Sequence, residues 1–188
     1  MLNEQGLKLI EERRSVRTYE DRQITEEELQ ELIKVAVNSP SAHNRQLFLF
    51  TVVQNKELLG EMAEAIRQVM LNGTPEQAAK ASKPGYSPLH HAPTVIFISG
   101  ELKSGFNVQS DCGIAAGLLM AAAEQMGLAS CMTGSSVFMF RGEDGEDLKK
   151  RLGIPDNYQS IGAVALGYLK GEKPAPAERR EGLVNIIR

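Results

Sequence analysis

The sequence predicts an α+β domain in which helices and strands follow one another without regular alternation. Several segments carry apolar residues at helical spacing, and others are short runs rich in β-branched and aromatic residues, which are typical of strands. Three or four strands among five helices in irregular order do not fit a doubly wound parallel sheet. The 188 residues, of which 42% are hydrophobic, are enough for one core. We therefore expect a single domain over residues 1–188.

Capping residues mark the helices expected in the first half of the chain. Thr25 precedes three glutamates and fits a capping box with Glu28, so it is expected to begin a helix. That helix should end before Pro40, because the residue before a proline is pushed out of the helical conformation. The elements expected here are a helix at about residues 3–12, a helix from Thr25 to residue 38, a strand at 47–53 and a helix capped by Asn55.

The second half combines an irregular segment with a very apolar helix. Four prolines and two glycines between residues 73 and 93 predict an irregular excursion with one helical turn around 76–81, and long loops of this kind are often binding loops or lids. Residues 111–126 are apolar on nearly every side, which predicts a helix buried in the core or at a subunit interface. The other elements expected here are strands at 94–99, 128–133 and 161–168 and a small helix at 148–152.

Composition and missing motifs exclude several classes of protein. A net charge of −3, from 21 basic and 24 acidic residues, argues against a nucleic-acid binder. Without a signal peptide or a membrane-spanning apolar run, we expect a cytoplasmic protein that does not enter a membrane. No metal site is expected, because Cys112 and Cys131 are interpreted as core residues and His90-His91 as loop surface. No glycine-rich dinucleotide or nucleoside-triphosphate loop is present.

The stretch ERRSVRTY is a concentrated basic spot in this acidic chain. Arginine presents a planar fork of donors that suits phosphate or carboxylate. In an extended segment, Arg13, Ser15 and Arg17 would point to one side and Arg14 to the other, so one side could clamp a phosphate. The alternative is a solvated arginine cluster paired with the neighbouring glutamates. Spacing alone leaves both interpretations open.

Two further segments carry polar groups that could face a ligand. Residues 40–46 combine a proline turn with side-chain amides, which donate and accept hydrogen bonds at once and suit the edge of a heteroaromatic ring. Residues 131–136 place a glycine among hydroxyls and can expose backbone N–H groups. Each segment alone is more simply an ordinary loop or strand-end turn.

Taken in order, these segments resemble the nitroreductase family of FMN-dependent oxidoreductases. The matching stretches are RRSVRTY, ITEEELQELIKVAVNSPSAHNRQ, SDCGIAAGLLMAAAEQMGLASC and LGIPDNYQSIGAVALGY. The resemblance implies a three-layer α+β fold, with a mixed, mainly antiparallel sheet flanked by helices. It also implies an interlocked homodimer with tightly bound FMN at the interface. The region that varies with substrate in the family, a loop or lid, corresponds to about residues 73–106.

The resemblance also assigns roles to residues of this chain. It implies that the arginine segment holds the FMN phosphate and ribityl chain, that the loop at 40–46 approaches the flavin from the other subunit, and that the segment after 132 lies near the central nitrogen of the flavin. Arg180, or Arg179 beside it, would complete the phosphate site. The cofactor-binding residues predicted in this way are Arg13, Arg14, Ser15, Arg17, Pro40, Ser41, Asn44, Gln46, Thr133, Gly134, Ser135 and Arg180.

The expected activity follows from the same resemblance. Reduced nicotinamide, NADH or NADPH, would pass electrons through FMN to an electron-poor acceptor, such as a nitroaromatic or quinone, in ping-pong order. No catalytic side chain is predicted, because the flavin carries the chemistry. The alternatives are reductive dehalogenation or dehydrogenation of a small metabolite on the same scaffold, a flavin-binding module without turnover, and a structural domain with a solvated arginine cluster.

Overall fold

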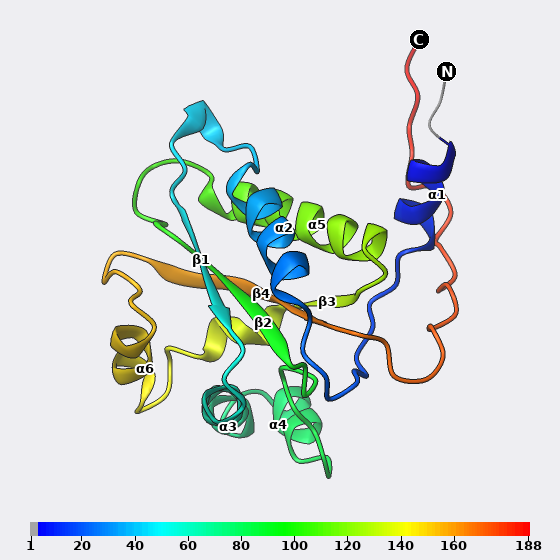
Figure 1. Cartoon of the computed structure of the whole chain (residues 1–188). Coiled ribbons are helices and arrows are strands. Elements are labelled where there is room, and N and C mark those ends of the chain that lie inside the picture. The colour runs from blue at the N-terminus through cyan, green and yellow to red at the C-terminus, as the bar shows by residue number, and fades with distance from the viewer. Residues whose placement is uncertain (1–3) are drawn as a thin grey trace.

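The computed structural model describes residues 4–188, and its centre is a four-stranded sheet in which every neighbouring pair of strands is antiparallel (Figure 1). The strand order is β1-β2-β4-β3, so β1 and β3 form the edges. A parallel element is present only as a single bridge between Ser15 and Ser130 at the β3 edge. The strands are β1 (Phe48–Val53), β2 (Thr94–Gly100), β3 (Ala129–Thr133) and β4 (Gln159–Gly167).

Helices cover both faces of the sheet and make three layers (Figure 1). Successive side chains of a strand point to opposite faces, so alternate residues of β2 pack into two separate hydrophobic cores. Val95 and Phe97 lie in one core, and Ile96 and Ile98 lie in the other. The predicted fold class is therefore confirmed. The helices are α1 (Glu4–Glu12), α2 (Glu26–Val37) and α5 (Val108–Gln125) toward one side, and α3 (Lys56–Leu71), α4 (Pro75–Ala81) and α6 (Gly145–Arg151) toward the other; the short 3-10 helices are η1 (Ala42–Asn44) and η2 (Gly134–Phe138).

Side-chain caps fix the helix starts, as the sequence predicts for α2 and α3. The Oγ atom of Thr25 accepts from Glu28 N at 3.2 Å, and the Glu28 carboxylate accepts from Thr25 N at 2.7 Å, which completes the capping box. Asn55 likewise accepts from Leu58 N at 2.8 Å. The first residue of the helix expected at 3–12, Asn3, lies outside the described residues.

Two helices begin earlier than predicted. α5 starts at Val108 rather than Asp111, because the Asn107 side chain accepts from Ser110 N at 3.3 Å and caps the additional turn. α6 starts at Gly145, three residues before the predicted Leu148. Gly145 packs so closely on the Phe140 backbone that a Cβ atom there would lie 2.5 Å from its carbonyl oxygen. This close approach joins residues five positions apart, and helical periodicity does not reveal it.

The apolar helix α5 buries only one of its sides within the chain. Ala115, Ala116 and Leu119 are fully buried against the sheet, at the i, i+1, i+4 spacing of one helix face. On the other side, Ile114 is 46% exposed and Leu118 is 39% exposed. The sequence left open whether this helix faces a core or a subunit interface; one side is in the core and the other remains uncovered.

The chain ends in an extended tail. Residues 170–188 contain no helix or strand and are exposed throughout, and the tail runs up beside α1 (Figure 1). It nevertheless carries four large apolar side chains, Leu183, Val184, Ile186 and Ile187. No helix described between residues 4 and 188 is long and apolar enough to cross a lipid bilayer.

Candidate functional site

The arginine segment leaves α1 and runs along the edge strand β3. Val16 N donates to Ser130 O at 3.0 Å, and Ser15 forms a parallel bridge with Ser130. Burial raises the pKa of the neighbouring Cys131 thiol, and the charges of Arg17 and Arg13 and a hydrogen bond from Ser15 oppose that rise. Arg13, Ser15 and Arg17 therefore all lie close enough to Cys131 to influence its pKa.

Arg13 and Arg14 have different surroundings. Arg14 Nη1 donates to Glu11 O and to Arg13 O, both at 2.8 Å, so its guanidinium caps the end of α1. Arg13 Nη1 is buried, and no acceptor lies within hydrogen-bond distance among residues 4–188. A buried guanidinium nitrogen without an acceptor is costly, so Arg13 is the group in this cluster that most needs an anion.

Thr133 and Ser135 lie next to this cluster, at the end of the same strand. Thr133 and Cys131 are two residues apart on one face of β3, about 7 Å from each other, and both are buried. Thr133 Oγ donates to Pro88 O at 2.8 Å, so the 2.9 Å hydrogen bond between the Thr133 and Ser135 hydroxyls is donated by Ser135. Gly134 between them is exposed, and a Cβ atom there would meet nothing within 4 Å.

Three residues from the predicted lid region face the same place and were not predicted. The charges of Lys80 and Arg17 both act on His90 and on Cys131, and the Ser135 hydroxyl opposes the rise that burial causes in the pKa of Tyr86. They were missed because α4 and the loop after it carry no motif; only tertiary folding brings them to β3. The interpretation of His90-His91 as loop surface holds for the exposed His91 but is wrong for His90, which is half-buried.

Both cysteines behave as the core residues that the sequence predicts. Burial and the nearby Asp111 carboxylate raise the pKa of Cys112 to about 12, and burial also raises the pKa of Cys131. Both thiols are therefore protonated at neutral pH and are poor nucleophiles. No group of three or more His, Cys, Asp or Glu between residues 4 and 188 is arranged to hold a metal ion.

The loop at 40–46 lies at the opposite end of α5. Its Ala42 N donates to Asp111 in the first turn of α5, whereas the arginine segment binds β3, which follows the last turn of that helix (Figure 1). The 18 residues of α5 span about 27 Å. Within one chain, therefore, Pro40, Ser41, Asn44 and Gln46 cannot reach a small ligand held by the arginine cluster.

The last predicted residue, Arg180, lies in the exposed tail. Within the described chain, neither Arg180 nor Arg179 forms a hydrogen bond or ion pair, and both are exposed. Each chain thus brings together the arginine segment and the residues after β3, and leaves the amide loop and the tail arginines elsewhere.

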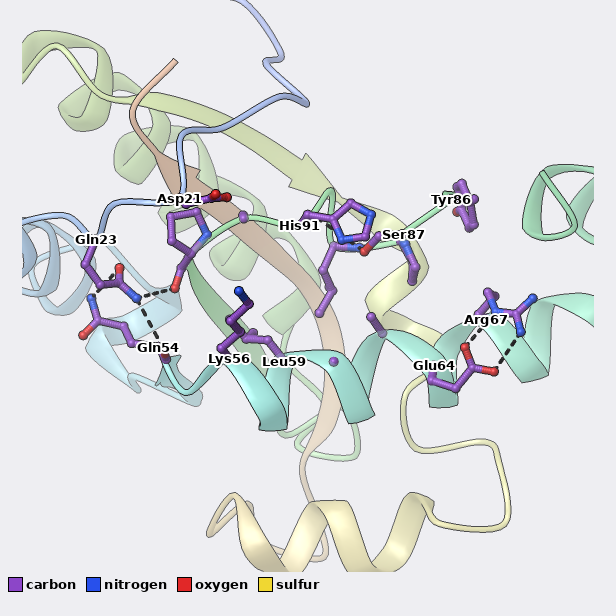
Figure 2. A pocket seen from close by; sticks show the side chains of 16 residues that line it. Asp21, Gln23, Gln54, Lys56, Leu59, Glu64, Arg67, Tyr86, Ser87 and His91 are labelled. Atoms are coloured by element: carbon purple, nitrogen blue, oxygen red, sulfur yellow. Dashed lines mark hydrogen bonds and ion pairs between the residues drawn. The ribbon is translucent and has the colours of Figure 1, made fainter. Parts of the chain in front are cut away.

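A separate cavity of about 380 Å³ lies between α3 and the segment Tyr86–Pro93 (Figure 2). The ion pair of Glu64 and Arg67 stands at one end, and the hydrogen-bonded amides of Gln23 and Gln54 stand at the other. None of the twelve predicted cofactor residues lines it. Pro88 connects the cavity with the arginine cluster, because it lines the cavity and its carbonyl oxygen accepts a hydrogen bond from Thr133, next to the cluster.

We expect His90 to make the protein sensitive to mild acid. Burial and the charges of Arg17, Lys80 and His91 lower the pKa of His90 to about 4, against about 6.5 in an unfolded chain. Between pH 6.5 and 4 the unfolded chain therefore binds more protons, so stability falls as the pH falls. Partial solvent exposure reduces the loss to about 1–2 kcal/mol.

The variant His90→Asn tests this expectation, because asparagine tolerates the positive φ of 58° at this position. Thermal unfolding without added cofactor, followed from pH 7 to pH 4.5, should show a smaller loss of stability for the variant than for the parent. Equal pH dependence in both proteins would contradict the role of His90.

The three-layer fold and the arginine cluster beside its edge strand define a class of protein, an α+β domain with concentrated positive charge at one edge of its sheet. The sequence pattern of the nitroreductase family matches residues 10–168, and this chain belongs to that family. An Archaeoglobus fulgidus protein that carries the provisional name NADH dehydrogenase/NAD(P)H nitroreductase is 34% identical over 172 residues, which are 90% of this chain and 88% of the relative.

Two other relatives are informative about the range of the family. The crystal structure of a nitroreductase with bound FMN from Bacteroides fragilis superposes with a TM-score of 0.90 at 28% identity, over 97% of this chain and 98% of that one. The iodotyrosine deiodinase of Haliscomenobacter hydrossis is 26% identical over 177 residues, which are 85% of this chain and 77% of that protein.

Proposed function

We propose that this chain is an FMN-dependent NAD(P)H oxidoreductase and that residues 1–188 form one FMN-binding domain. The observation that carries the proposal is the buried Nη1 atom of the half-buried Arg13, which lacks an acceptor among the described residues. A phosphate would supply that acceptor. Membership of the nitroreductase family and the FMN held by the Bacteroides fragilis relative support FMN as the source of the phosphate.

The residues at the end of β3 fit such a cofactor. Arg13, Ser15 and Arg17 offer charged and hydroxyl donors for the phosphate and the adjoining chain, and Arg17 also stands beside His90. The pKa of His90, lowered to about 4, keeps its imidazole neutral at working pH, so it can accept a hydrogen bond as well as donate one. Thr133, Gly134 and Ser135 would face the ring system. When bound, FMN supplies the redox chemistry, accepting electrons from a reduced nicotinamide and returning them to an acceptor.

We further propose that two chains form a homodimer that completes two such sites. About 27 Å of α5 separates the loop at 40–46 from the arginine cluster, so Asn44 can serve a flavin only across an interface. The uncovered side of α5, with Ile114 and Leu118, supplies an apolar surface for that interface. The exposed apolar tail, which also carries Arg180, needs a partner surface for the same reason.

The acceptor that we propose is an electron-poor small molecule, such as a nitroaromatic or quinone, reduced in ping-pong order. Reductive dehalogenation is the second candidate, and the similarity to an iodotyrosine deiodinase favours it over other reactions. A cytoplasmic location remains a prediction from the sequence.

The visible spectrum of the purified protein, before and after incubation with FMN and removal of free flavin, tests the proposal. We expect a yellow protein whose absorbance bleaches when NADH or NADPH is added without oxygen and returns when a nitroaromatic or quinone follows. A protein that stays colourless after FMN would overturn the proposal. If flavin binds but neither NADH nor NADPH bleaches its absorbance, the result would instead indicate a flavin-binding module. If the chemically reduced protein is reoxidised only by a halogenated aromatic compound, the result would favour dehalogenation.

A further inference from the structure

The loop at 40–46 is held in an unfavourable backbone conformation. His43, Asn44 and Gln46 all have positive φ, at 51°, 54° and 53°, a region in which residues other than glycine are uncommon. Three such residues within four positions require contacts that fix them. The identity of those contacts decides which residues control Asn44.

Hydrogen bonds within the loop fix its shape. Ser41 accepts twice, with its backbone oxygen from Asn44 N and with its hydroxyl from Gln46 N, both at 3.0 Å. The Gln46 side chain donates to Asn44 Oδ1 at 3.0 Å. These bonds close the loop on itself but do not attach it to the rest of the molecule.

One segment outside the loop provides that attachment. Asp111 Oδ2 accepts from Ala42 N at 3.1 Å, and Asp111, 8% exposed, is the one acidic residue that is buried among those described. The Phe106 ring meets the His43 ring edge-on at 5.9 Å between centroids and lies 5.3 Å from the Arg45 guanidinium carbon. Phe106 and Asp111 thus attach the loop to the rest of the molecule.

The position of Asp111 explains why a buried carboxylate is tolerated there. It lies in the first turn of α5, where the helix dipole and the backbone N–H groups favour a negative charge. Its hydrogen bond to Ala42 is charge-assisted and therefore stronger than a neutral one. This bond connects the loop to the longest helix of the chain.

We propose that Asp111 is a positioning residue for flavin binding, which acts through Ala42 to hold Asn44 in the conformation that meets the ring system. This inference rests on the proposed function. It assigns a role to a residue that is not among the twelve predicted cofactor residues and whose side chain accepts a hydrogen bond from Ala42, which is not among them either. Asp111→Ala should loosen the loop, whereas Asp111→Asn keeps an oxygen that can accept from Ala42 N.

The first measurement is the FMN affinity of cofactor-free protein, followed by quenching of flavin fluorescence. We expect Asp111→Ala to weaken binding about tenfold, and Asp111→Asn to recover most of the loss. If Asp111 acts through Asn44, the double variant Asp111→Ala/Asn44→Ala should bind no more than about twofold more weakly than Asn44→Ala alone, because coupled changes are not additive. Full multiplication of the two losses, or parental affinity in a folded Asp111→Ala protein, would overturn the proposal.

A second measurement does not depend on flavin. Trypsin can cut after Arg45 in the exposed loop, and we expect cofactor-free Asp111→Ala to be cut there several times faster than the parent or Asp111→Asn. Equal cleavage rates in Asp111→Ala and the parent would overturn the positioning role even if FMN binds. If the parental protein never binds FMN, the proposed function fails, and the trypsin result alone decides whether Asp111 holds the loop. If Asp111→Ala does not fold, Phe106→Leu replaces it, because this substitution removes the ring contacts without changing a buried charge. Phe106→Leu is expected to be cleaved faster and to bind FMN more weakly than the parent. Parental behaviour of this variant would contradict the inference.

Discussion

Replacing Arg13 with alanine is expected to weaken FMN binding by about 10- to 100-fold, while the same replacement of Arg14 leaves it close to the parental value. Arg13 Nη1 is buried and lacks an acceptor among residues 4–188, so a phosphate would displace no existing hydrogen bond of this atom. Arg14 Nη1 already donates to Glu11 O and Arg13 O. Losing a hydrogen bond to a charged group costs about 1.5–3 kcal/mol, which sets the expected range.

Fluorescence titration of the cofactor-free variants with FMN measures the two affinities. Arg14→Ala is the matched control, because it removes the same charge one residue away. Titrating riboflavin, which lacks the phosphate, adds a second control, since its affinity should hardly distinguish the two variants. Equal losses in both variants would mean that the cluster acts by its summed charge, and a larger loss for Arg14→Ala would reverse the assignment.

Replacing Gly117 with leucine is expected to dissociate the proposed dimer, at a cost of about 2–6 kcal/mol, because two copies of an overpacked side chain would enter the proposed interface. Gly117 lies on the uncovered side of α5 near Leu118, and a Cβ atom there would meet nothing within 4 Å in the described chain. Leucine is also a better helix former than glycine by about 0.5–1 kcal/mol. The single subunit should therefore not be destabilised, and only a partner chain can make this substitution costly.

Gly60→Leu provides the control, because Gly60 is also helical and also has open space around its missing Cβ atom, but lies on α3 and lines the cavity of Figure 2. Sedimentation equilibrium should find Gly60→Leu dimeric and Gly117→Leu monomeric, with FMN bound only by the former. Two equally stable dimers would contradict an interface on this side of α5. If both variants form equally weakened dimers, the cause would be a general effect of leucine on helix packing.

Local signals predicted most of the fold. The caps at Thr25 and Asn55 and the β-branched runs specify their elements within a few neighbouring residues, so α2, α3 and the strands appear near their predicted bounds. The early start of α6 coincides instead with the packing of Gly145 against the Phe140 backbone, for which no cap or periodic pattern in the sequence gives a signal.

The candidate site was predictable in pieces rather than as a whole. The alternation of an extended segment predicts that Arg13, Ser15 and Arg17 share a side, and all three influence the pKa of Cys131. The roles of Lys80 and His90 depend on a loop that folds back to β3, and the role proposed for Asp111 depends on one hydrogen bond across 69 residues.

The length of α5 also has a consequence for mixtures of damaged subunits. If each flavin takes its arginines from one chain and its amide loop from the other, a hybrid of one Arg13→Ala chain with one Asn44→Ala chain concentrates both lesions in one site and leaves the other site intact. Two impaired homodimers would then exchange subunits to give hybrids, each of which carries one intact site. Lesions at opposite ends of a single helix would thus complement each other, as mutations in separate genes do.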